Sequence, residues 1–311
     1  MTIAELFTLL RKSAAAWNND DASSMGAALA FYTLFSIAPL LVMVIAVASL
    51  IFGRDAAQGH ILGQLRGLTG EAGAQALEDL LKSANSPAKS ALAAVVGTVV
   101  LLLGATTLFT ELYGNLNRIW RSPSAPKASG IWHLIRTRIL SFGMILGIGF
   151  LLLVSLVVSA GLAAAGEWWG ARFTGWPLVG QAVSFVMSLA TYTLAFAMIY
   201  KFLPRAHIDW HDVWIGATVT AVLFEIGKLL IGLYVDTTSF TSVFGAAGSL
   251  VVLLVWVYYS AQVFLLGAEF TRVYAYRRGS RAGEEPPKPP PQRQGRPLKA
   301  PPARWARPGN Q

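Results

Sequence analysis

Two ionisable residues interrupt an apolar stretch that runs from residue 213 to 234. Glu225 and Lys228 are three positions apart, so a helix carries both on one face. In the hydrocarbon core of a membrane each would cost about 2.5–3.5 kcal/mol unless it met a partner or a wet cavity. Two interpretations stay open: a structural ion pair, or part of a polar cavity that binds a charged substrate or relays protons.

Two further glutamates, Glu111 and Glu269, lie near the ends of apolar stretches. We expect them at headgroup depth, in an interfacial structural role, with basic partners drawn from Arg118, Arg121 and Arg272. If the glutamates converged on one cavity, a transport function would be favoured. Three uncharged residues are additional candidates for the polar lining of that cavity: Tyr32, Asn117 and Tyr234.

No catalytic constellation is present in the sequence. It lacks the GxxxxGK[ST], GxSxG and HExxH motifs and has no cysteine. His207 and His211 are four positions apart, which suits one metal ion on a helix, but zinc needs three or four ligands. Asp209 or Asp212 more simply caps the start of the next helix. We therefore expect no enzyme, no catalytic residue, no metal and no cofactor.

Three residues are candidates for a kink or a gate: Pro39, Gly245 and Gly248. Pro39 lies midway along an apolar stretch, and membrane helices tolerate proline where hydroxyl side chains such as that of Ser36 satisfy the freed carbonyls. A simple kink and a break at a substrate site both stay open. The two glycines are predicted in an outer loop, where they would permit a tight turn.

Membrane helices are the elements that must position these residues. Of 311 residues, 54% are apolar and 13% are charged, whereas soluble domains carry about 25% charged residues. A helix that crosses the bilayer needs about 20 apolar residues, and the long apolar runs show no strand-like alternation. Six stretches qualify: 27–52, 91–112, 139–165, 179–202, 213–234 and 250–271. The predicted fold class is therefore all-α, a bundle of six transmembrane helices spanning residues 27–276.

The segments outside the spans have their own patterns. Residues 1–26 carry apolar residues at helical spacing, typical of an amphipathic helix that lies on the membrane surface or packs as a cap on the bundle. Similar spacing between the first two spans predicts one or two amphipathic helices over the outer mouth. Residues 277–311 form a predicted disordered tail, because nine of the fifteen prolines lie beyond residue 278.

The basic residues predict the orientation of the spans. Nineteen of the 25 Lys and Arg residues lie on the side that holds both termini, five lie on the other side, and Lys228 lies in a span. Cytoplasmic loops carry the excess of Lys and Arg, so both termini are predicted to be cytoplasmic. The basic tail is expected to attract anionic lipid headgroups, at about 1 kcal/mol per charge. Nucleic acid is not an expected partner, because the tail offers no structured platform.

Several local patterns resemble the YihY/BrkB-type family of inner-membrane proteins, once misnamed ribonuclease BN. They are GAALAFYTLFSIAPLL (26–41), NRIW (117–120), YKFLP (200–204), the Glu225–Lys228 pair, FGAAGSL (244–250) and LLVWVYYSAQVFLLGAEFTR (253–272). The resemblance covers about residues 17–276, and Phe244 stands where family members more often have tyrosine. It implies a six-span protein of the bacterial inner membrane, described as a candidate transporter and sometimes linked to envelope integrity or virulence. It does not imply ribonuclease activity.

Two functional hypotheses follow. The first is a transporter or flippase-like protein whose substrate, a lipid or another amphiphile, contacts a polar central cavity near Glu225 and Lys228. Without an ATPase motif, active transport would need an ion gradient or a partner. The alternative is a non-transporting envelope scaffold, which predicts a closed and well-packed bundle. A homo-oligomer and an envelope partner both stay open.

Overall fold

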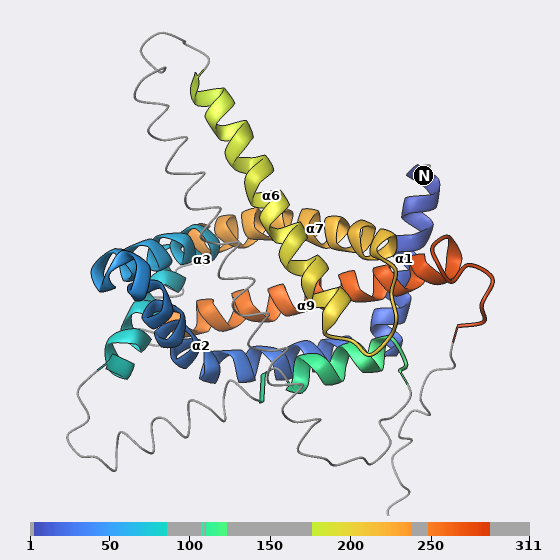
Figure 1. Ribbon diagram of the computed structural model, residues 1–311, viewed down its shortest axis with the longest axis horizontal. Helices are drawn as coiled ribbons and strands as arrows, with labels where there is room; N and C mark the ends of the chain where they lie inside the picture. The colour runs from blue at the N-terminus through green and yellow to red at the C-terminus, as the bar shows by residue number, and fades with distance from the viewer. Residues whose placement is uncertain (1–2, 86–106, 109, 123–175, 238–247, 287–311) are drawn as a thin grey trace, which may run out of the picture.

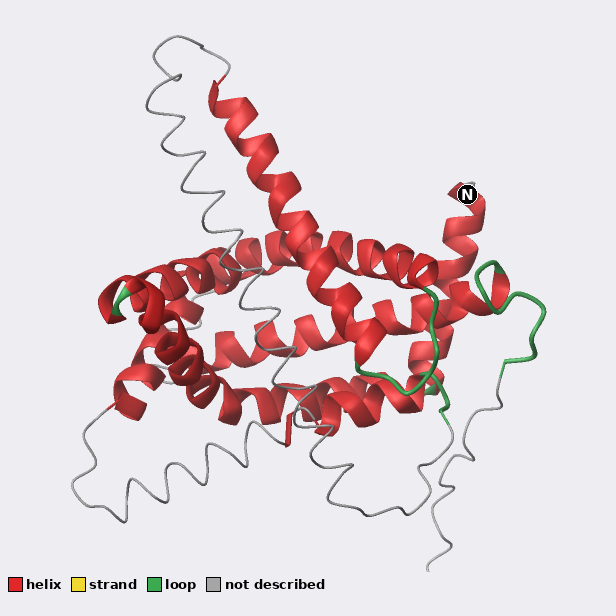
Figure 2. Cartoon of the chain, in the orientation of Figure 1, coloured by secondary structure: helices red, strands yellow, loops and turns green. Residues whose placement is uncertain are grey.

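The computed structural model describes residues 3–85, 107–108, 110–122, 176–237 and 248–286. Within these residues all regular secondary structure is helical, as Figure 2 shows. The helices are α1 (Ile3–Asn19), α2 (Ala22–Phe52), α3 (Arg54–Asn85), α6 (Trp176–Phe202), α7 (Trp210–Thr237) and α9 (Gly248–Arg277). A further helical stretch covers residues 110–119. The described part of the chain therefore agrees with the predicted all-α class.

Helix α9 is the centre of the arrangement. It packs against α2 on one side and α7 on the other, and these three helices run side by side in Figure 1. Helix α6 crosses α7 steeply and packs on it with its C-terminal half. Helix α1 runs across one end of the three helices, and α3 lies at the opposite end (Figure 1). The first and last described helices therefore meet at one end of the bundle.

Within the described residues, three helices are long and apolar enough to cross a membrane by length and composition: Gly180–Phe202, Trp210–Ile231 and Leu250–Arg277. They coincide with the predicted spans 179–202, 213–234 and 250–271. The predicted span 27–52 lies within the unbroken helix α2. The predicted span 139–165 and most of 91–112 lie outside the described residues, so the count of six stays a prediction while the membrane class is supported.

Two residues with a positive φ set the turns around α2. Asp21, with φ 56°, joins α1 to α2, and aspartate is among the few side chains that adopt this conformation readily. Gly53, with φ 78°, ends α2 and lets α3 begin at the next residue. Glycine has no Cβ to oppose a positive φ. The chain therefore changes direction at both ends of α2 through very short connections.

The candidates for kinks are placed as follows. Helix α2 continues through Pro39. Proline has no N–H group, so Pro39 leaves the carbonyl of Phe35, four residues earlier, without its helical donor. The hydroxyl of Ser36 donates instead to the carbonyl of Tyr32 at 2.8 Å. The expectation that Ser36 satisfies the freed carbonyl is therefore not met. Gly248 is the first residue of α9 and not part of a loop turn, and Gly245 lies outside the described residues.

The segment after the first predicted span forms one 32-residue helix, α3, which is the first of the two arrangements predicted there. Its inner face carries Leu77 and Leu81, both fully buried. They belong to the same apolar cluster as Leu41 of α2 and Leu253 of α9. Burying a leucine side chain contributes about 1.5–3 kcal/mol, and this free energy holds α3 against that end of the bundle.

Helix α1 packs on the bundle through one face. Leu9 is buried, and it lies in one apolar cluster with Phe270 and Tyr274 of α9. Phe7, on another face of α1, is 69% exposed. Of the two predicted roles for this segment, the packed cap is therefore observed, and its transverse direction (Figure 1) also suits a position in the membrane surface.

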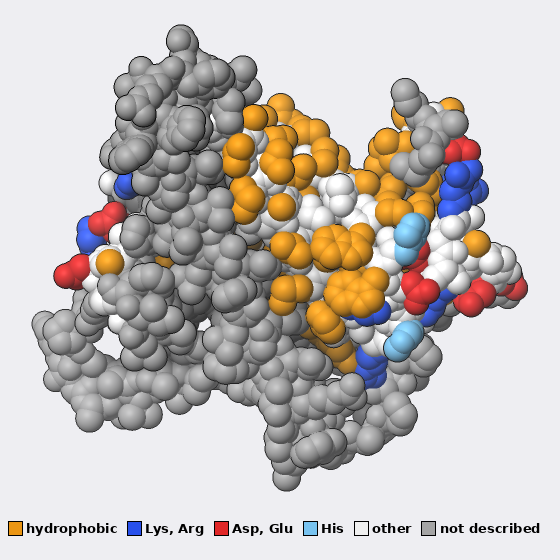
Figure 3. All heavy atoms as spheres, turned by 45° about the horizontal axis from the view of Figure 1, so that its top comes forward, with side chains coloured by type: hydrophobic (Ala, Val, Ile, Leu, Met, Phe, Trp, Pro, Cys, Tyr) orange, Lys and Arg blue, Asp and Glu red, His pale blue; other side chains and the backbone are white. Residues whose placement is uncertain are grey.

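The outward face of α7 is mostly apolar, as expected where a helix faces lipid. Exposed residues recur there every four positions, and all are apolar except Thr218: Trp210, Trp214, Thr218, Val222, Ile226 and Leu230. Figure 3 shows apolar side chains gathered on this side of the molecule, with charged side chains and histidines at one end. Tryptophan is enriched at the boundary between membrane and water, so the two tryptophans are consistent with that boundary lying near the start of α7.

Candidate functional site

The predicted pair on α7 is an ion pair within the bundle. The Nζ atom of Lys228 donates to Oε1 of Glu225 at 2.9 Å, and Glu225 is 8% exposed. The same ammonium group lies 5.7 Å from the ring centre of Tyr192 on α6, a cation–π contact. The second carboxylate oxygen, Oε2, has no hydrogen-bond partner among the described residues. Within the described part of the chain, one acceptor in this site is therefore unused.

Glycine brings α9 close to α7 near the level of this pair. A Cβ atom on Gly227 would lie 2.0 Å from the ring of Tyr259 on α9, closer than real Cβ contacts allow. The ring therefore rests directly on the backbone of α7, but on another side of the helix, because residues one and two positions apart do not share a helix face. Tyr192 of α6 supplies an aromatic contact to the ion pair itself.

A second buried cluster joins three parts of the chain. Arg272 of α9 donates through Nε and Nη2 to Oε2 of Glu269 at 3.0 and 2.7 Å. Its Nη2 atom also lies 3.9 Å from Asp20, at the turn between α1 and α2. Arg121, after the helical stretch 110–119, is 3.5 Å from the other oxygen of Asp20. Asp20, Glu269 and Arg272 are each at least 95% buried.

The second cluster is formally neutral but incompletely hydrogen-bonded. It contains two carboxylates and two guanidinium groups, and Oδ2 of Asp20 and Oε1 of Glu269 have no hydrogen-bond partner among the described residues. The indole nitrogens of Trp17 and Trp120 are likewise buried without a described partner. Groups of this kind bind buried water or a small polar ligand. The cluster ties the start of α2 to α9, because removing one charge would leave the others buried and unpaired.

Two of the predicted glutamates, Glu225 and Glu269, belong to separate ion-pair clusters. Glu225 and Glu269 share no partner, and Glu269 is ten positions beyond Tyr259 on α9, about 15 Å along a helix. Glu269 pairs with Arg272, one of the partners considered for it, and it is fully buried in the protein. Its expected position at headgroup depth stays a prediction. Glu111 is half-buried on the stretch 110–119 and has no ion pair within the described part of the chain. The glutamates therefore occupy separate environments.

The uncharged candidates have local roles. Asn117 accepts a hydrogen bond from the backbone N–H of Arg205 at 2.9 Å and donates to the carbonyl of Tyr113 at 2.8 Å, so it fastens a loop. Its predicted role in lining a cavity stays a prediction. Tyr32 is half-buried on α2, with its ring edge-on to Phe31. Tyr234 belongs to α7, and its side chain lies outside the described parts.

The two histidines of the HIDWHD stretch do not share a ligand set. Among the described residues no three His, Cys, Asp or Glu side chains are grouped to hold a metal ion. The carboxylate of Asp212 is fully buried and accepts hydrogen bonds from the backbone and hydroxyl of Ser280, at 3.0 and 2.6 Å. The carbonyl of His207 accepts a hydrogen bond from Arg281. These contacts fold residues 278–281 back onto the start of α7, so packed structure extends into the predicted tail.

Sequence reasoning missed Asp20 and Tyr192. Asp20 lies shortly before the first apolar stretch. The predicted topology puts Asp20, Arg121 and Arg272 on the same side of the membrane, and this was the available signal that the three could pair. Tyr192 carried no signal, because an aromatic residue in an apolar helix is ordinary.

Comparison with known proteins gives a consistent result. A family model described as Virulence factor BrkB matches residues 13–293. The chain is similar to a UPF0761 membrane protein of Pseudomonas aeruginosa, 30% identical over 80% of this chain and 58% of that protein. It is also similar to one of Ralstonia nicotianae, 31% identical over 86% of this chain and 58% of that protein. The chain thus spans less than three-fifths of the length of these curated relatives. No solved structure matches it.

Proposed function

The chain belongs to the Virulence factor BrkB family of membrane proteins, and from this premise we propose that it is a transporter or flippase-like protein of the bacterial inner membrane. Membership confirms the resemblance found in the sequence. In this proposal the protein is not an enzyme, and both termini are cytoplasmic. Its solute is a charged molecule or an amphiphile such as a lipid, which passes Glu225 and Lys228.

The unused oxygen of the buried ion pair is the observation that carries the proposal. Burying Glu225 and Lys228 within a bundle is costly, and their mutual contact uses only one of the two carboxylate oxygens. A buried acceptor without a donor costs about 1–3 kcal/mol. A passing solute with an N–H, an O–H or a positive charge would satisfy it, so this oxygen is suited to transient binding.

A second candidate, the non-transporting scaffold, is favoured by close packing between the helices. A Cβ atom on Gly216 of α7 would lie 1.8 Å from the hydroxyl of Thr271, and one on Gly267 of α9 would lie 1.9 Å from that of Thr220. At these positions α7 and α9 leave no space between them. A transporter with this packing would have to be in an occluded state, whereas a scaffold would simply stay closed.

The deciding experiment uses the full chain reconstituted into vesicles that contain fluorescent phosphatidylglycerol in both leaflets. Dithionite destroys the fluorescence of the outer leaflet, so further loss reports movement of lipid between leaflets. We expect the wild-type protein to cause further loss, and Glu225→Gln and Lys228→Gln each to slow it by about tenfold, equivalent to about 1.4 kcal/mol.

A matched pair serves as control. Glu78 and Lys82 of α3 are also 2.9 Å apart, but both are exposed, so Glu78→Gln should leave lipid movement unchanged. Wild-type vesicles that keep their inner-leaflet fluorescence would count against lipid transport and in favour of the scaffold. Full activity in a folded double variant of Glu225 and Lys228 would remove the pair from the mechanism.

A further inference from the structure

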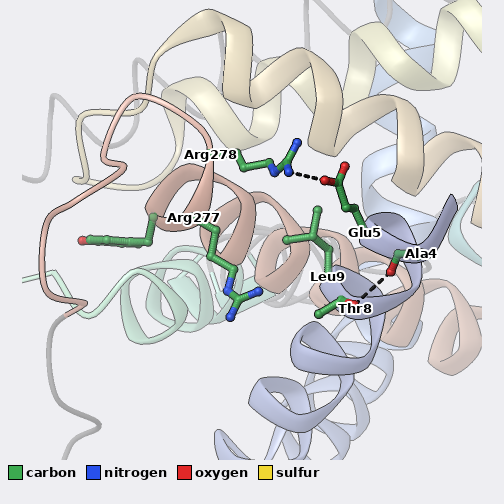
Figure 4. Close-up of a pocket in the computed structure, with 7 residues that line it drawn as sticks. Ala4, Glu5, Thr8, Leu9, Arg277 and Arg278 are labelled. Atoms are coloured by element: carbon green, nitrogen blue, oxygen red, sulfur yellow. Dashed lines mark hydrogen bonds and ion pairs between the residues drawn. The ribbon is translucent and has the colours of Figure 1, made fainter. Parts of the chain in front are cut away.

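A pocket of about 540 Å³ opens where α1 crosses the end of α9. Its volume falls within the range of about 300–1,000 Å³ that is usual for small-molecule sites. Figure 4 shows residues from the first turns of α1 on one side and from the end of α9 on the other. The lining residues are Ala4, Glu5, Thr8, Leu9, Tyr276, Arg277 and Arg278.

The charges in this pocket are unequal. Arg278 pairs with Glu5 across the pocket, as the dashed line in Figure 4 shows. Arg277 is exposed and has no ion pair with any described residue. Its side chain extends from α9, and its guanidinium group ends level with Thr8 of α1 (Figure 4). The lining therefore carries one net positive charge, and a guanidinium group is free to bind an anion.

The pocket also lies where a membrane would place its headgroups. The apolar helix that is long enough to cross the membrane ends at Arg277, and α1 runs across the end of the bundle (Figure 1). Phe7, on the neighbouring turn of α1, is 69% exposed. An exposed aromatic residue on a helix of this kind enters the boundary between headgroups and acyl chains.

We infer that this pocket binds the phosphate of an anionic phospholipid, held by Arg277. A guanidinium group binds phosphate oxygens through two parallel N–H donors. The hydroxyl of Thr8 already donates to the carbonyl of Ala4, so its oxygen is left as an acceptor for a headgroup hydroxyl such as that of phosphatidylglycerol. Leu9 and Ala4 supply an apolar wall for the glycerol and the first acyl carbons.

This site differs from a diffuse attraction between the tail and the membrane. It predicts a bound lipid of defined stoichiometry at named residues, and it stands whether or not the protein transports anything. The occupant is a lipid and not free phosphate, because the pocket combines a cation with an apolar wall at the end of a spanning helix.

Native mass spectrometry of the full chain in detergent, titrated with phosphatidylglycerol, tests the inference. We expect one tightly bound lipid, and an affinity about fivefold lower in Arg277→Gln, as about 1 kcal/mol per basic residue predicts. Glu5→Gln should raise the affinity, because it removes a negative charge and frees Arg278. Arg66→Gln is the matched control, since Arg66 lies in α3 and pairs with Glu71.

Three results would overturn the inference. Equal affinity for phosphatidylcholine would show that the headgroup charge is not recognised. Equal binding of inorganic phosphate would show that the acyl portion contributes nothing and that the occupant is a soluble anion. Unchanged lipid affinity in Arg277→Gln, with wild-type thermal stability, would show that the pocket is not the site.

Discussion

Replacing Gly267 by alanine should destabilise the bundle at the place where three helices meet. The added Cβ atom would lie 1.9 Å from the hydroxyl oxygen of Thr220 on α7 and 2.6 Å from that of Tyr200 on α6. The hydroxyl of Tyr200 is fixed by the carbonyl of Phe264 at 2.7 Å and lies 3.1 Å from the Thr220 hydroxyl. Neither hydroxyl can move without giving up a buried contact.

The size of the effect follows from two costs and one gain. Forcing an extra carbon into a packed interior costs about 1–3 kcal/mol, and a displaced hydrogen bond costs about 0.5–1.5 kcal/mol. The gain in helix propensity from glycine to alanine offsets at most about 1 kcal/mol. We therefore expect Gly267→Ala to lower the free energy of unfolding by roughly 0.5–4.5 kcal/mol.

The assay is reversible unfolding in mixed micelles, followed by the fluorescence of the ten tryptophans. Thr220→Ala removes the nearest clashing atom, so the double variant should lose less stability than the two single variants combined. The rescue should be partial, because the Cβ of residue 220 would still lie 2.8 Å from the new atom. Gly180→Ala in α6 is the control, since nothing lies within 4 Å of its added Cβ.

Wild-type stability in Gly267→Ala would refute this account of the packing. Additivity of the two replacements to within about 0.5 kcal/mol would do the same, because residues in contact should couple. A loss of stability in Gly180→Ala of equal size would indicate a general intolerance of the helices to substitution.

Two further predictions concern the end of the bundle that holds α1. Asp20→Asn should lower the free energy of unfolding by about 3–5 kcal/mol, because Arg272 would lose a buried counter-charge. Asp21→Asn, at the neighbouring exposed position, should change the free energy of unfolding by less than about 0.5 kcal/mol. Chemical denaturation in micelles measures both variants, and equal effects would contradict the role of the cluster. Gly279→Ala should release the turn of residues 278–281 from Asp212, since the new Cβ would lie 2.1 Å from the carboxylate of Asp212. Trypsin should then cut this turn about tenfold faster. An unchanged cleavage rate would show that the contact between Asp212 and the turn is unimportant.

Local patterns in the sequence were sufficient for part of this structure. The apolar stretches at 179–202, 213–234 and 250–271 coincide with α6, α7 and α9, because a bilayer fixes the length of a spanning helix. The Glu225–Lys228 ion pair follows from spacing on one helix turn. Both are properties of residues close together in the chain.

Contacts between distant segments could not be predicted in the same way. Asp20 lies close to Arg272 in the folded protein, although most of the chain separates the two in sequence. No periodicity in either segment indicates that the two residues are partners. Asn117 was a candidate for lining a cavity, yet its amide fastens the backbone of Arg205, because side-chain amides serve loops as readily as ligands. The polarity of a residue was visible in the sequence, but its partner depended on how the helices pack.

The docking of α1 on α9 has a consequence for how the protein is made. Glu5 and Arg278, which pair in the finished molecule, are 273 positions apart. At about 5–20 residues per second of synthesis, roughly 14–55 s separate their appearance from the ribosome. During that interval the apolar face of α1 around Leu9 has no α9 to cover it. The nascent helix would therefore wait on the membrane surface, and closing of the bundle would be among the last steps of biogenesis.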